Sequence, residues 1–379
     1  MLAWARVRVL IDYRPALRQR TGVGEYAHQL ATALVPRLAP DGTLLVFSSS
    51  WKDRLSPGAV PGAWTIDLRI PVRALNFAWH RLGWPPAELL AAPVDVVHSM
   101  HPIRIPARNA AQVVTINDLF FLDAPELTTA EIRRDYPALA AQHARSADGV
   151  IVISEHTARK VVSRLHVPRE RITVCTPGAP SWTPRAPGVQ GSEAGPILFV
   201  GTVEPRKNVP TLLAAYGRLL SRLPDAPGLI LAGGAPRESA AIIGELSAPP
   251  LAGHAKHIGY VPDEQREPLY RAASILVVPS FDEGFGMTAL EAMTIGVPVV
   301  ASNRGALPEV IGDAGLLVDP EDAEGFAAAM ERLLRDKDLR NRYAELGIER
   351  ARRFSWTASA EGAIQAYGRA IEQRALRKA

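Results

Sequence analysis

The sequence predicts an α/β protein built from two doubly wound domains, and three observations lead to this class. Short segments that are apolar throughout alternate with segments of helical periodicity along all 379 residues. Strands of that kind belong to parallel sheets whose two faces are both covered by helices. The alternation restarts once, after residues 181–195. The length also suits two domains better than one.

Six segments of the first half are expected to be buried strands, because they are short and apolar throughout. They are residues 6–12, 44–48, 95–99, 112–117, 149–154 and 171–177. A helix is expected between the first two strands, where apolar residues recur at helical spacing: Tyr26, Leu30, Leu34 and Leu38. Residues 129–147 predict a second helix, and Ser154 is placed to cap a third helix that runs to Leu165.

The second half repeats this alternation. Its expected strands are residues 196–201, 228–234, 256–261, 274–280, 298–302 and 315–320. Its expected helices are residues 208–223, 263–273 and 285–295, followed by amphipathic helices to the end. Residues 181–195 lack periodicity and are rich in proline and glycine, which is typical of a linker. We therefore predict a first domain over residues 1–180, a second over 196–355 and a terminal helix over 356–379.

The composition excludes several classes of protein. Hydrophobic residues make up 47% of the chain and charged residues 22%, so the chain can bury a core and is not expected to be disordered. The single cysteine, Cys175, excludes a disulfide scaffold and suits a reducing compartment. No apolar run approaches the ~18 residues of a membrane span. Arg6 and Arg8 interrupt what would be the core of a signal peptide, so we expect a cytoplasmic protein.

The charge is unevenly distributed between the two halves. Residues 1–190 contain 22 Lys and Arg against 15 Asp and Glu, whereas residues 191–379 contain 21 against 24. The basic first half favours an anionic partner, either a phospholipid surface or a phosphate-bearing substrate, but a solvated basic surface explains it equally well. Nucleic acid is not expected as a partner, because no basic run carries interleaved aromatic residues.

Residues 69–84 are the best candidate for a peripheral contact with the inner face of a membrane. The segment combines cationic and aromatic side chains: Arg69, Arg73, Phe77, Trp79, Arg81 and Trp84. The alternative is that its aromatic side chains belong to the hydrophobic core, and the sequence alone favours that alternative.

Residues 281–300 carry two carboxylates eight positions apart, Glu283 and Glu291. Between them, Gly284 and Gly286 allow the backbone to approach a ligand closely, and the N–H groups of a first helical turn attract phosphate. A fully helical path would separate the two carboxylates by about 12 Å, roughly the span from hexose to ribose in a nucleotide sugar. We therefore expect one carboxylate at each end of such a ligand. Taken alone, the pair is better explained by a capping acid and a surface glutamate.

A second strand–loop–helix segment, residues 200–213, carries Arg206 and Lys207 directly before Asn208, a residue type that caps helices. Two cations at this position can clamp a diphosphate leaving group. Only 6 of the 43 basic residues are lysine, so a lysine in this loop is informative. A solvated basic turn is the alternative. Two loops that attract phosphate on one edge of a sheet favour phosphate binding.

A glycine-containing loop follows the first expected strand. Gly22 and Gly24 there fit a dinucleotide-binding pattern only poorly, because the second strand ends in serines and not in an acid. We expect this loop to approach an anion.

Polar residues also follow two strands of the first half. Asn117 and Asp118 end one strand at the position where a substrate hydroxyl would lie, and His98 and His101 end the preceding strand. The two histidines lack a third ligand at a convincing spacing, so no metal is expected.

Together these motifs resemble the retaining glycosyltransferases of family 4. That family has the GT-B fold, in which two Rossmann-like domains face a central cleft. The resemblance covers nearly the whole chain and depends most on Glu283, Glu291 and the Pro-Arg-Lys-Asn turn. The matching segments are residues 21–30, 115–126, 152–162, 200–208, 259–261, 283–302, 307–320 and 354–356.

The resemblance implies a nucleotide sugar donor, GDP- or UDP-linked, and a glycan or lipid-linked glycan acceptor, with no metal and no other cofactor. It implies that Glu283 contacts the donor hexose, Glu291 the ribose, and Arg206 and Lys207 the diphosphate. The further donor-binding positions that it implies are Gly22, Gly24, Gly201, Val261, Gly284, Phe285, Gly286 and Met287.

On the acceptor side, the corresponding positions are His98, His101 and Asp118, with Asn117 beside the reacting centre. The terminal helix, from about Trp356, is implied to cross back onto the first domain.

The sequence departs from the family pattern at two positions. Asn117 stands where relatives usually have histidine, and asparagine forms hydrogen bonds but does not titrate near pH 7. A general-acid role is therefore excluded at this position, and the donor sugar can differ from that of histidine-bearing relatives. Glu25 stands where relatives often have arginine, which puts the acceptor side in doubt.

The resulting hypothesis is retaining transfer of a hexose, with mannose as the first choice, without a covalent enzyme intermediate. Three alternatives remain open at this point. They are a sugar-nucleotide epimerase of the same fold, an inactive nucleotide-sugar-binding protein, and a Rossmann oxidoreductase, which the missing ribose acid disfavours.

Overall fold

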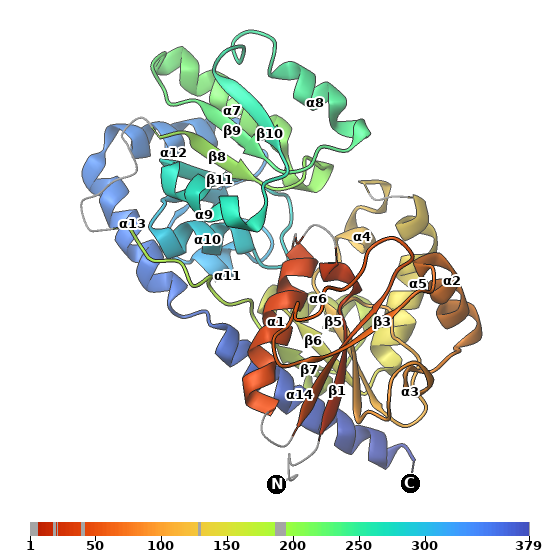
Figure 1. Cartoon of the computed structure of the whole chain (residues 1–379). Coiled ribbons are helices and arrows are strands. Elements are labelled where there is room, and N and C mark those ends of the chain that lie inside the picture. Colours follow the sequence, from red (N-terminus) through yellow and green to blue (C-terminus); the bar gives the residue numbers. More distant parts are fainter. Residues whose placement is uncertain are drawn as a thin grey trace. The chain divides into compact units, whose positions relative to one another are not determined.

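The computed structural model describes residues 7–17, 20, 22–38, 42–127, 130–185 and 195–378. The chain divides into two compact units (Figure 1). The first comprises Met1–Gly178 and Ser355–Ala379, and the second is Ala179–Phe354. Each unit is a parallel sheet with helices, as the alternation of apolar strands and periodic helices predicts.

The first unit contains a seven-stranded parallel sheet with the strand order β3-β2-β1-β4-β5-β6-β7. The strands are β1 (Arg8–Asp12), β2 (Thr43–Ser49), β3 (Trp64–Leu68), β4 (Val96–Ser99), β5 (Ala111–Ile116), β6 (Gly149–Val152) and β7 (Ile172–Val174). The direction of strand succession reverses between β1 and β4. In sheets of this type ligands bind beyond the carboxyl ends of the strands at such a reversal.

All six strands predicted in the first half are present, and β3 is the additional one. It lies at the edge of the sheet, and its residues are exposed or half-buried. A strand that buries little has no continuous apolar run, so the sequence pattern does not reveal it.

The helices of the first unit cover its sheet and its edges. They are α1 (Gly22–Leu38), α2 (Val72–Phe77), α3 (Ala87–Leu90), α4 (Phe120–Asp123), α5 (Ala130–Ser146), α6 (Glu155–Leu165) and α14 (Trp356–Leu376). The Ser154 hydroxyl accepts a hydrogen bond from the Thr157 amide at 3.0 Å and caps α6, as predicted. Helix α14, at the end of the chain, packs against α1 and against β4 to β7, so it is part of this unit.

The second unit contains a six-stranded parallel sheet with the order β10-β9-β8-β11-β12-β13, which reverses between β8 and β11. The strands are β8 (Ile197–Val200), β9 (Leu229–Ala232), β10 (Ala255–Gly259), β11 (Ile275–Val278), β12 (Val299–Ser302) and β13 (Leu316–Val318). The helices are α7 (Val209–Arg222), α8 (Ala240–Glu245), α9 (Asp263–Ala272), α10 (Met287–Ile295), α11 (Leu307–Ile311), α12 (Ala323–Arg335) and α13 (Lys337–Ala351).

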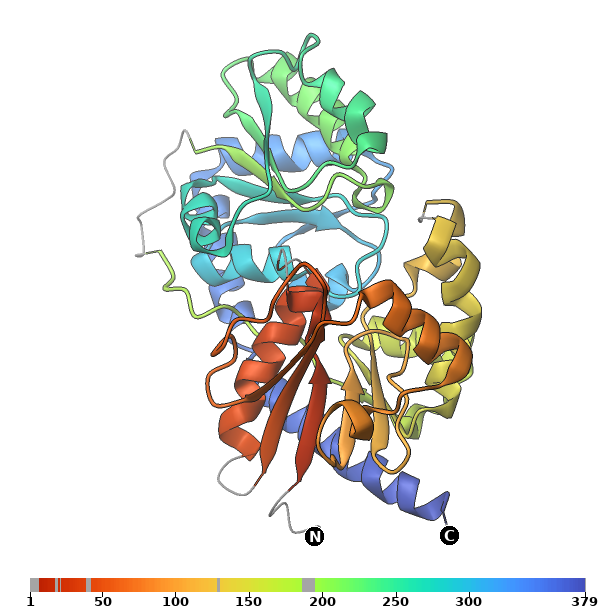
Figure 2. The ribbon, with the colours of Figure 1, turned by 45° about the vertical axis from the view of Figure 1, so that its right-hand side comes forward.

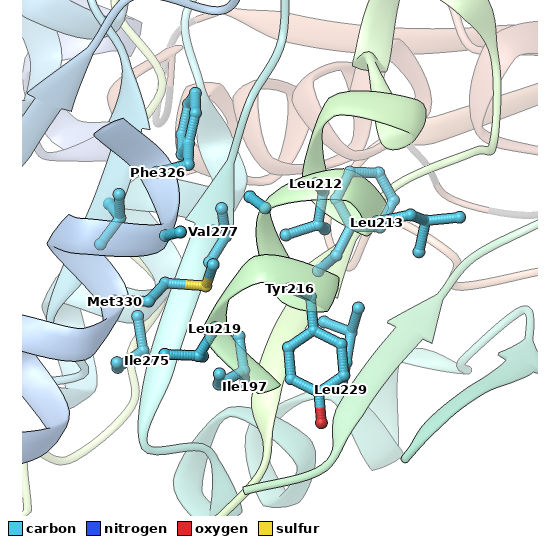
Figure 3. Close-up of a cluster of buried hydrophobic side chains, with 14 of the residues drawn as sticks. Ile197, Leu212, Leu213, Tyr216, Leu219, Leu229, Ile275, Val277, Phe326 and Met330 are labelled. Carbon is cyan, nitrogen blue, oxygen red and sulfur yellow. The ribbon is translucent and has the colours of Figure 1, made fainter. Parts of the chain in front are cut away.

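The core of the second unit forms where α7 and α12 pack side by side on the sheet (Figure 3). Tyr216 and Leu219 of α7, Ile275 of β11, and Phe326 and Met330 of α12 belong to one cluster of buried side chains. All five side chains are fully buried. This packing holds the sheet, and with it the loops at its carboxyl edge, in place.

The segment predicted as a linker is partly integrated into the second unit. The Arg185 amide donates to the Ile295 carbonyl at 3.0 Å. The Arg185 guanidinium donates to the carbonyls of Tyr270, Arg271 and Ala273. Arg185 is therefore bound to the second unit, and residues 186–194 of the predicted linker lie outside the described residues. Among the helices of the described ranges, none is both long enough and apolar enough to cross a membrane.

Candidate active site

The reversal of strand order in the second unit brings two sequence motifs together. Strands β8 and β11 are neighbours, so the loops that follow them share one edge of the sheet. The first loop contains a 3₁₀ turn, Pro205–Lys207, and the second contains Glu283. The Phe281 amide donates to the Arg206 carbonyl at 2.9 Å and fastens the loops to each other. The expectation that both motifs lie on one sheet edge is confirmed.

Both cations of the first loop hold the Glu283 carboxylate. The Lys207 ammonium lies 2.6 Å from one carboxylate oxygen, and the Arg206 guanidinium lies 3.2 Å from the other. The Ser280 hydroxyl donates to the first oxygen at 2.7 Å. These four side chains are called the Glu283 cluster below. Burial alone would raise the pKa of Glu283, but the charges of Lys207 and Arg206 outweigh it and lower that pKa below its ordinary value.

The Glu283 cluster faces solvent through its cations. Glu283 is 6% exposed, whereas the side chains of Arg206 and Lys207 remain 19% and 14% exposed. The Glu204 carboxylate lies 3.1 Å from Arg206 and adds an exposed acid at the rim. Cations that are accessible yet held by hydrogen bonds can meet an anion without first being ordered.

Asn208 does not cap α7 in the way that the sequence predicts. Its backbone has a φ of 53°, and its side chain makes no capping hydrogen bond. Instead, the amide nitrogen donates to the carbonyls of Pro279, at 3.1 Å, and Pro320, at 2.6 Å. The physical reason is that the left-handed backbone turns this side chain inward, where it joins three loops of the carboxyl edge.

Gly305, which the sequence analysis did not single out, allows close approach to Glu283. Its φ is +68°, and a Cβ atom there would lie 2.6 Å from the Glu283 amide nitrogen. The Ala306 amide donates to the Glu283 carbonyl at 2.9 Å, so the loop after β12 holds the backbone of Glu283 in place. The sequence signal that could have indicated this position is a glycine in the loop after β12, the strand next to β11.

Glu291 lies on α10 and is also buried, with 4% exposure. One of its oxygens forms an ion pair with Arg266 of α9, which also reaches Asp263 at 3.2 Å. The other oxygen is buried and has no hydrogen-bond partner within the described part of the chain. Arg266 was not predicted, because nothing in the sequence shows that α9 and α10 pack together.

The distance predicted between Glu283 and Glu291 assumes a fully helical path, and the structure contradicts that assumption. Helix α10 begins only at Met287, and Gly286 before it has a φ of +105°. Glu283 therefore lies in a loop, and a distance for a helical path does not apply. Phe285 is 2% exposed, and its ring packs edge-to-face on Phe354 with the centroids 5.4 Å apart. Its side chain therefore belongs to the core, which leaves backbone contact as its way to meet a ligand.

The remaining donor-side positions are distributed over both units. In the second unit, Gly284 follows Glu283 in the same loop, Met287 begins α10, and Val261 lies between β10 and α9 at the same sheet edge. The Gly201 amide donates to the Ala232 carbonyl at 2.8 Å, directly after β8.

In the first unit, two glycines begin α1. Gly22 is its first residue, and a Cβ atom there would meet open space. A Cβ atom at Gly24 would lie 2.5 Å from the Pro15 carbonyl, so Gly24 is needed for packing. Glu25 is 9% exposed, and its carboxylate accepts a hydrogen bond from the side-chain amide nitrogen of Gln29 at 2.8 Å.

His98 does not fit its predicted role as an acceptor residue. It is completely buried. Its ring nitrogens lie 2.8 Å from the Tyr367 hydroxyl and 2.7 Å from the Thr115 hydroxyl. Burial lowers the pKa of His98 to about 3, so the ring is neutral. It is a core residue that joins β4 and β5 to α14.

His101 also lacks a free ring nitrogen. One nitrogen is 3.1 Å from the Asp12 carboxylate, and the other accepts a hydrogen bond from the Ile103 amide at 3.2 Å. Asp12 is fully buried at the reversal point of the first sheet and is also bound by two guanidinium nitrogens of Arg14, each at 2.7 Å. Both ring nitrogens of His101 thus have partners within the first unit, and its acceptor-binding role stays a prediction.

Asn117 and Asp118 lie directly after β5, as predicted. The Asp118 carboxylate accepts a hydrogen bond from the Phe120 amide at 3.1 Å and so turns the chain toward α4. The Asn117 amide nitrogen donates to the Met100 carbonyl at 3.3 Å. Its side-chain oxygen is buried and has no hydrogen-bond partner in the described ranges. Within those ranges no group of three or more His, Cys, Asp or Glu side chains is placed to hold a metal ion.

Two protein families match the chain. Residues 186–350 match the family described as "Glycosyl transferases group 1", and residues 20–180 match "Glycosyltransferase Family 4". The chain is 34% identical to the O-antigen chain mannosyltransferase B of Escherichia coli, over 95% of this chain and 99% of that protein. It is 32% identical to a D-inositol 3-phosphate glycosyltransferase of Nocardia farcinica, over 77% of this chain and 64% of that protein.

Solved structures show the same fold. The sucrose-phosphate synthase of Thermosynechococcus elongatus matches with a TM-score of 0.77 and 22% identity, over 96% of this chain and 98% of that one. The Anabaena protein HepE, in complex with UDP and glucose, matches with a TM-score of 0.69 and 16% identity, over 95% and 98% of the two chains.

Proposed function

Because this chain belongs to the group 1, family 4 glycosyltransferases and has their GT-B fold, we propose that it transfers a hexose with retention of configuration. The donor is a nucleotide diphosphate sugar, GDP- or UDP-linked, and the acceptor is a hydroxyl of a glycan or lipid-linked glycan. Mannose is the first choice of sugar, and the Escherichia coli relative, named a mannosyltransferase, supports it.

The single observation that carries this proposal is the Glu283 cluster. It holds two accessible cations against one buried carboxylate at the point where the strand order reverses. Helix α10, which has nine residues, begins at Met287, four positions after Glu283, and its N-terminus adds a partial positive charge. A diphosphate needs fixed positive charge most when it departs, because its negative charge increases in the transition state.

In the proposed reaction the acceptor oxygen bonds to the anomeric carbon on the face from which the leaving group departs. The bond between that carbon and the phosphate oxygen breaks, and the departing phosphate oxygen takes the acceptor proton. Arg206 and Lys207 stabilise the leaving nucleoside diphosphate. No metal or other cofactor takes part in this proposal, and no covalent intermediate forms on the protein.

The two glutamates are assigned to opposite ends of the donor. Glu283 accepts hydroxyl groups of the hexose and keeps Arg206 and Lys207 in place, since its oxygens already contact both cations. Glu291 accepts a ribose hydroxyl through the carboxylate oxygen that has no partner in the described part of the chain. Asn117, whose side-chain oxygen likewise has no partner in the described ranges, accepts a sugar hydroxyl.

Product analysis tests this proposal. Purified protein is incubated with GDP-mannose or a UDP-hexose, with and without a glycan acceptor, and nucleoside diphosphate and sugar products are measured. We expect nucleotide release that the acceptor accelerates, and a glycoside with the anomeric configuration of the donor. Conversion of the donor to another nucleotide sugar without acceptor would instead indicate an epimerase, and absence of any turnover with all donors would contradict transfer.

The proposal also retains the prediction of a cytoplasmic protein that makes peripheral contact with an anionic membrane through its first domain.

A further inference from the structure

Large hydrophobic side chains that are exposed gather in one stretch of the chain. Ten such side chains occur among the described residues, and seven of them lie between positions 51 and 89: Trp51, Trp64, Val72, Phe77, Leu82, Trp84 and Leu89. The other three are scattered, at Val162, Ile258 and Leu376. Single exposed hydrophobic residues are normal, but a concentration of them marks an interaction surface.

Helix α2 and the π-helical turn that continues it, Ala78–Leu82, have two different sides. Leu75 and Trp79 are buried and pack in the core of the first unit. Phe77 is 62% exposed. Arg73 and Arg81 lie four positions before and after Phe77 and are exposed as well. Residues spaced by four positions share one side of a helix, so these three side chains point away from the core together.

The exposed side continues beyond the helix at both ends. Arg69 precedes α2, and Leu82 and Trp84 follow Arg81 with exposures of 68% and 56%. We call the set Arg69, Arg73, Phe77, Arg81, Leu82 and Trp84 the arginine–aromatic face. Figure 2 shows this segment, in deep orange, at the periphery of the first unit. The favoured alternative, that these aromatic side chains belong to the core, is confirmed for Trp79 and wrong for Phe77 and Trp84, which are exposed.

The charge of this face is positive and uncompensated. Residues 69–87 contain three arginines and no aspartate or glutamate. None of these three guanidinium groups forms an ion pair within the described ranges, whereas the nearby Arg54 pairs with Asp67 at 2.8 Å. Arginines that lack acidic neighbours keep their charge available for an external anion.

The inner side of the same segment is firmly anchored. The Trp79 indole donates to the Pro85 carbonyl at 2.9 Å, which holds the loop that carries Trp84. The Arg14 guanidinium lies over the Trp79 ring, 4.7 Å from its centroid, and donates to the Asn76 side chain at 2.9 Å. The face is therefore presented by a rigid support, and Arg14 connects it to the carboxyl end of β1.

We propose that the arginine–aromatic face docks on an anionic lipid bilayer. Helices that lie in the membrane interface combine basic and bulky apolar side chains on the side that meets the lipid. Tryptophan concentrates at membrane interfaces, and arginines are attracted to anionic headgroups. The inference stands on exposed residues of the first unit alone. If the proposed function also holds, docking brings a lipid-linked acceptor to the edge of the sheet where Asp12 and Asn117 lie.

A second copy of the chain is a poorer occupant of this face. A symmetric dimer through one patch packs that patch against itself, so the residues of one copy meet other residues of the same set. Here it would bring the same three arginines together without any acid in residues 69–87 to balance them. A bilayer with anionic lipid complements both the charge and the apolar side chains.

Co-sedimentation of the full-length protein with vesicles tests the proposal. Vesicles of phosphatidylcholine alone are compared with vesicles that also contain phosphatidylglycerol, at low and at high salt. We expect binding to the anionic vesicles that weakens with salt. Replacing Arg69, Arg73 and Arg81 by glutamine should weaken the partitioning by about fivefold for each arginine, since each contributes about 1 kcal/mol near an anionic surface. Phe77→Ser together with Trp84→Ser should also weaken it.

Matched variants remove the same number of charges and of exposed apolar side chains elsewhere. Arg237, Arg342 and Arg352 are exposed on the second unit, and their combined change to glutamine should leave vesicle binding within about twofold once the general effect of net charge is allowed for. Ile258→Ser with Leu376→Ser is the apolar control. Equal losses in the face variants and the controls, or no binding of the wild type to anionic vesicles, would overturn the proposal. Self-association that the face variants abolish, without vesicle binding, would overturn it in favour of a dimer.

Binding of GDP and UDP to the same protein samples separates this proposal from the proposed function. The face variants should bind a nucleotide as the wild type does, because the Glu283 cluster lies in the second unit. Loss of vesicle binding with nucleotide binding intact is the expected result for these variants. A wild type that binds vesicles but no nucleotide would contradict the proposed function and leave the docking surface supported.

Discussion

The two units share a topology but differ in the ion cluster at the point where the strand order reverses. In the first unit, Asp12 at the end of β1 is fully buried and is bound by Arg14 and His101. In the second unit, Glu283 is bound by two cations that remain partly exposed. The same architecture thus provides a buried ion cluster with a structural role in one unit and a cluster with accessible cations in the other. Position in the fold alone does not identify a binding site, whereas the balance and exposure of charge at that position does.

The largest effect should follow from breaking the structural cluster. Asp12→Asn removes the charge that compensates Arg14, whose side chain is only 9% exposed. Loss of one partner of a buried ion pair costs about 3–5 kcal/mol of unfolding free energy. Denaturant unfolding monitored by tryptophan fluorescence measures it, because Trp79 lies under Arg14. The double variant Asp12→Asn/Arg14→Met should recover part of the loss, and a double variant as unstable as the single one would contradict this account of the cluster.

Breaking the accessible cluster should affect turnover more than stability. Lys207→Ala removes a cation from the proposed diphosphate clamp, and loss of one such preorganised group costs about 10²–10³ in rate. Nucleotide release from a sugar donor measures it. Lys256→Ala, an exposed lysine on β10, is the matched control and should keep the wild-type rate. A Lys207→Ala variant that releases nucleotide at the wild-type rate would refute the assignment.

Gly305→Ala should disturb the Glu283 cluster by displacing the backbone of Glu283. The added methyl group would lie 2.6 Å from the Glu283 amide nitrogen, in a backbone conformation with a φ of +68°. Such strain costs about 1–3 kcal/mol. We expect a lower unfolding free energy and slower nucleotide release. Gly234→Ala, at which a Cβ atom would meet open space, is the control. Equal behaviour of the two variants would show that the close approach at Gly305 has no effect on Glu283.

Lowering the pH should reduce the unfolding free energy through both clusters, and by less than the substitutions above. Burial opposes ionisation of Asp12 and Glu283, but Arg14 in one case and Lys207 with Arg206 in the other lower each pKa below its ordinary value of 3.8 or 4.5. A lowered folded-state pKa stabilises the protein above the ordinary pKa, and this stabilisation is lost as the pH falls through the folded-state value. The unfolding free energy should therefore decline below about pH 4.5, and less steeply in Glu283→Gln. Identical pH profiles would contradict the lowered pKa of Glu283.

Much of the fold could be predicted from the sequence, because buried parallel strands are apolar throughout. The strand β3 could not, since an edge strand such as Trp64–Leu68 has no such run. Within the candidate site, Arg206, Lys207 and Glu283 could be placed on one sheet edge because each follows a strand. Their direct contact could not be predicted, because it depends on β8 and β11 being neighbours although they are far apart in the chain.

The wrong prediction for His98 and the contacts that the sequence did not reveal have the same origin in long-range packing. His98 ends a strand, but its burial depends on Tyr367, which is 269 positions away in the sequence. His101 is bound by Asp12, 89 positions away. The partner of Glu291, Arg266, lies on another helix. Residue types and spacing indicate which loops reach the carboxyl edge, whereas tertiary contacts decide which of their side chains remain available.

Isothermal titration of GDP and UDP into the wild type, Lys207→Ala and Lys256→Ala most directly tests the claim that the Glu283 cluster binds the donor diphosphate. We expect one of these nucleotides to bind the wild type and the Lys256→Ala variant with equal affinity. Affinity for the Lys207→Ala variant should fall by about tenfold or more, because a charge-assisted hydrogen bond contributes about 1.5–3 kcal/mol. Equal affinity in all three proteins, or no binding of either nucleotide to the wild type, would contradict the claim.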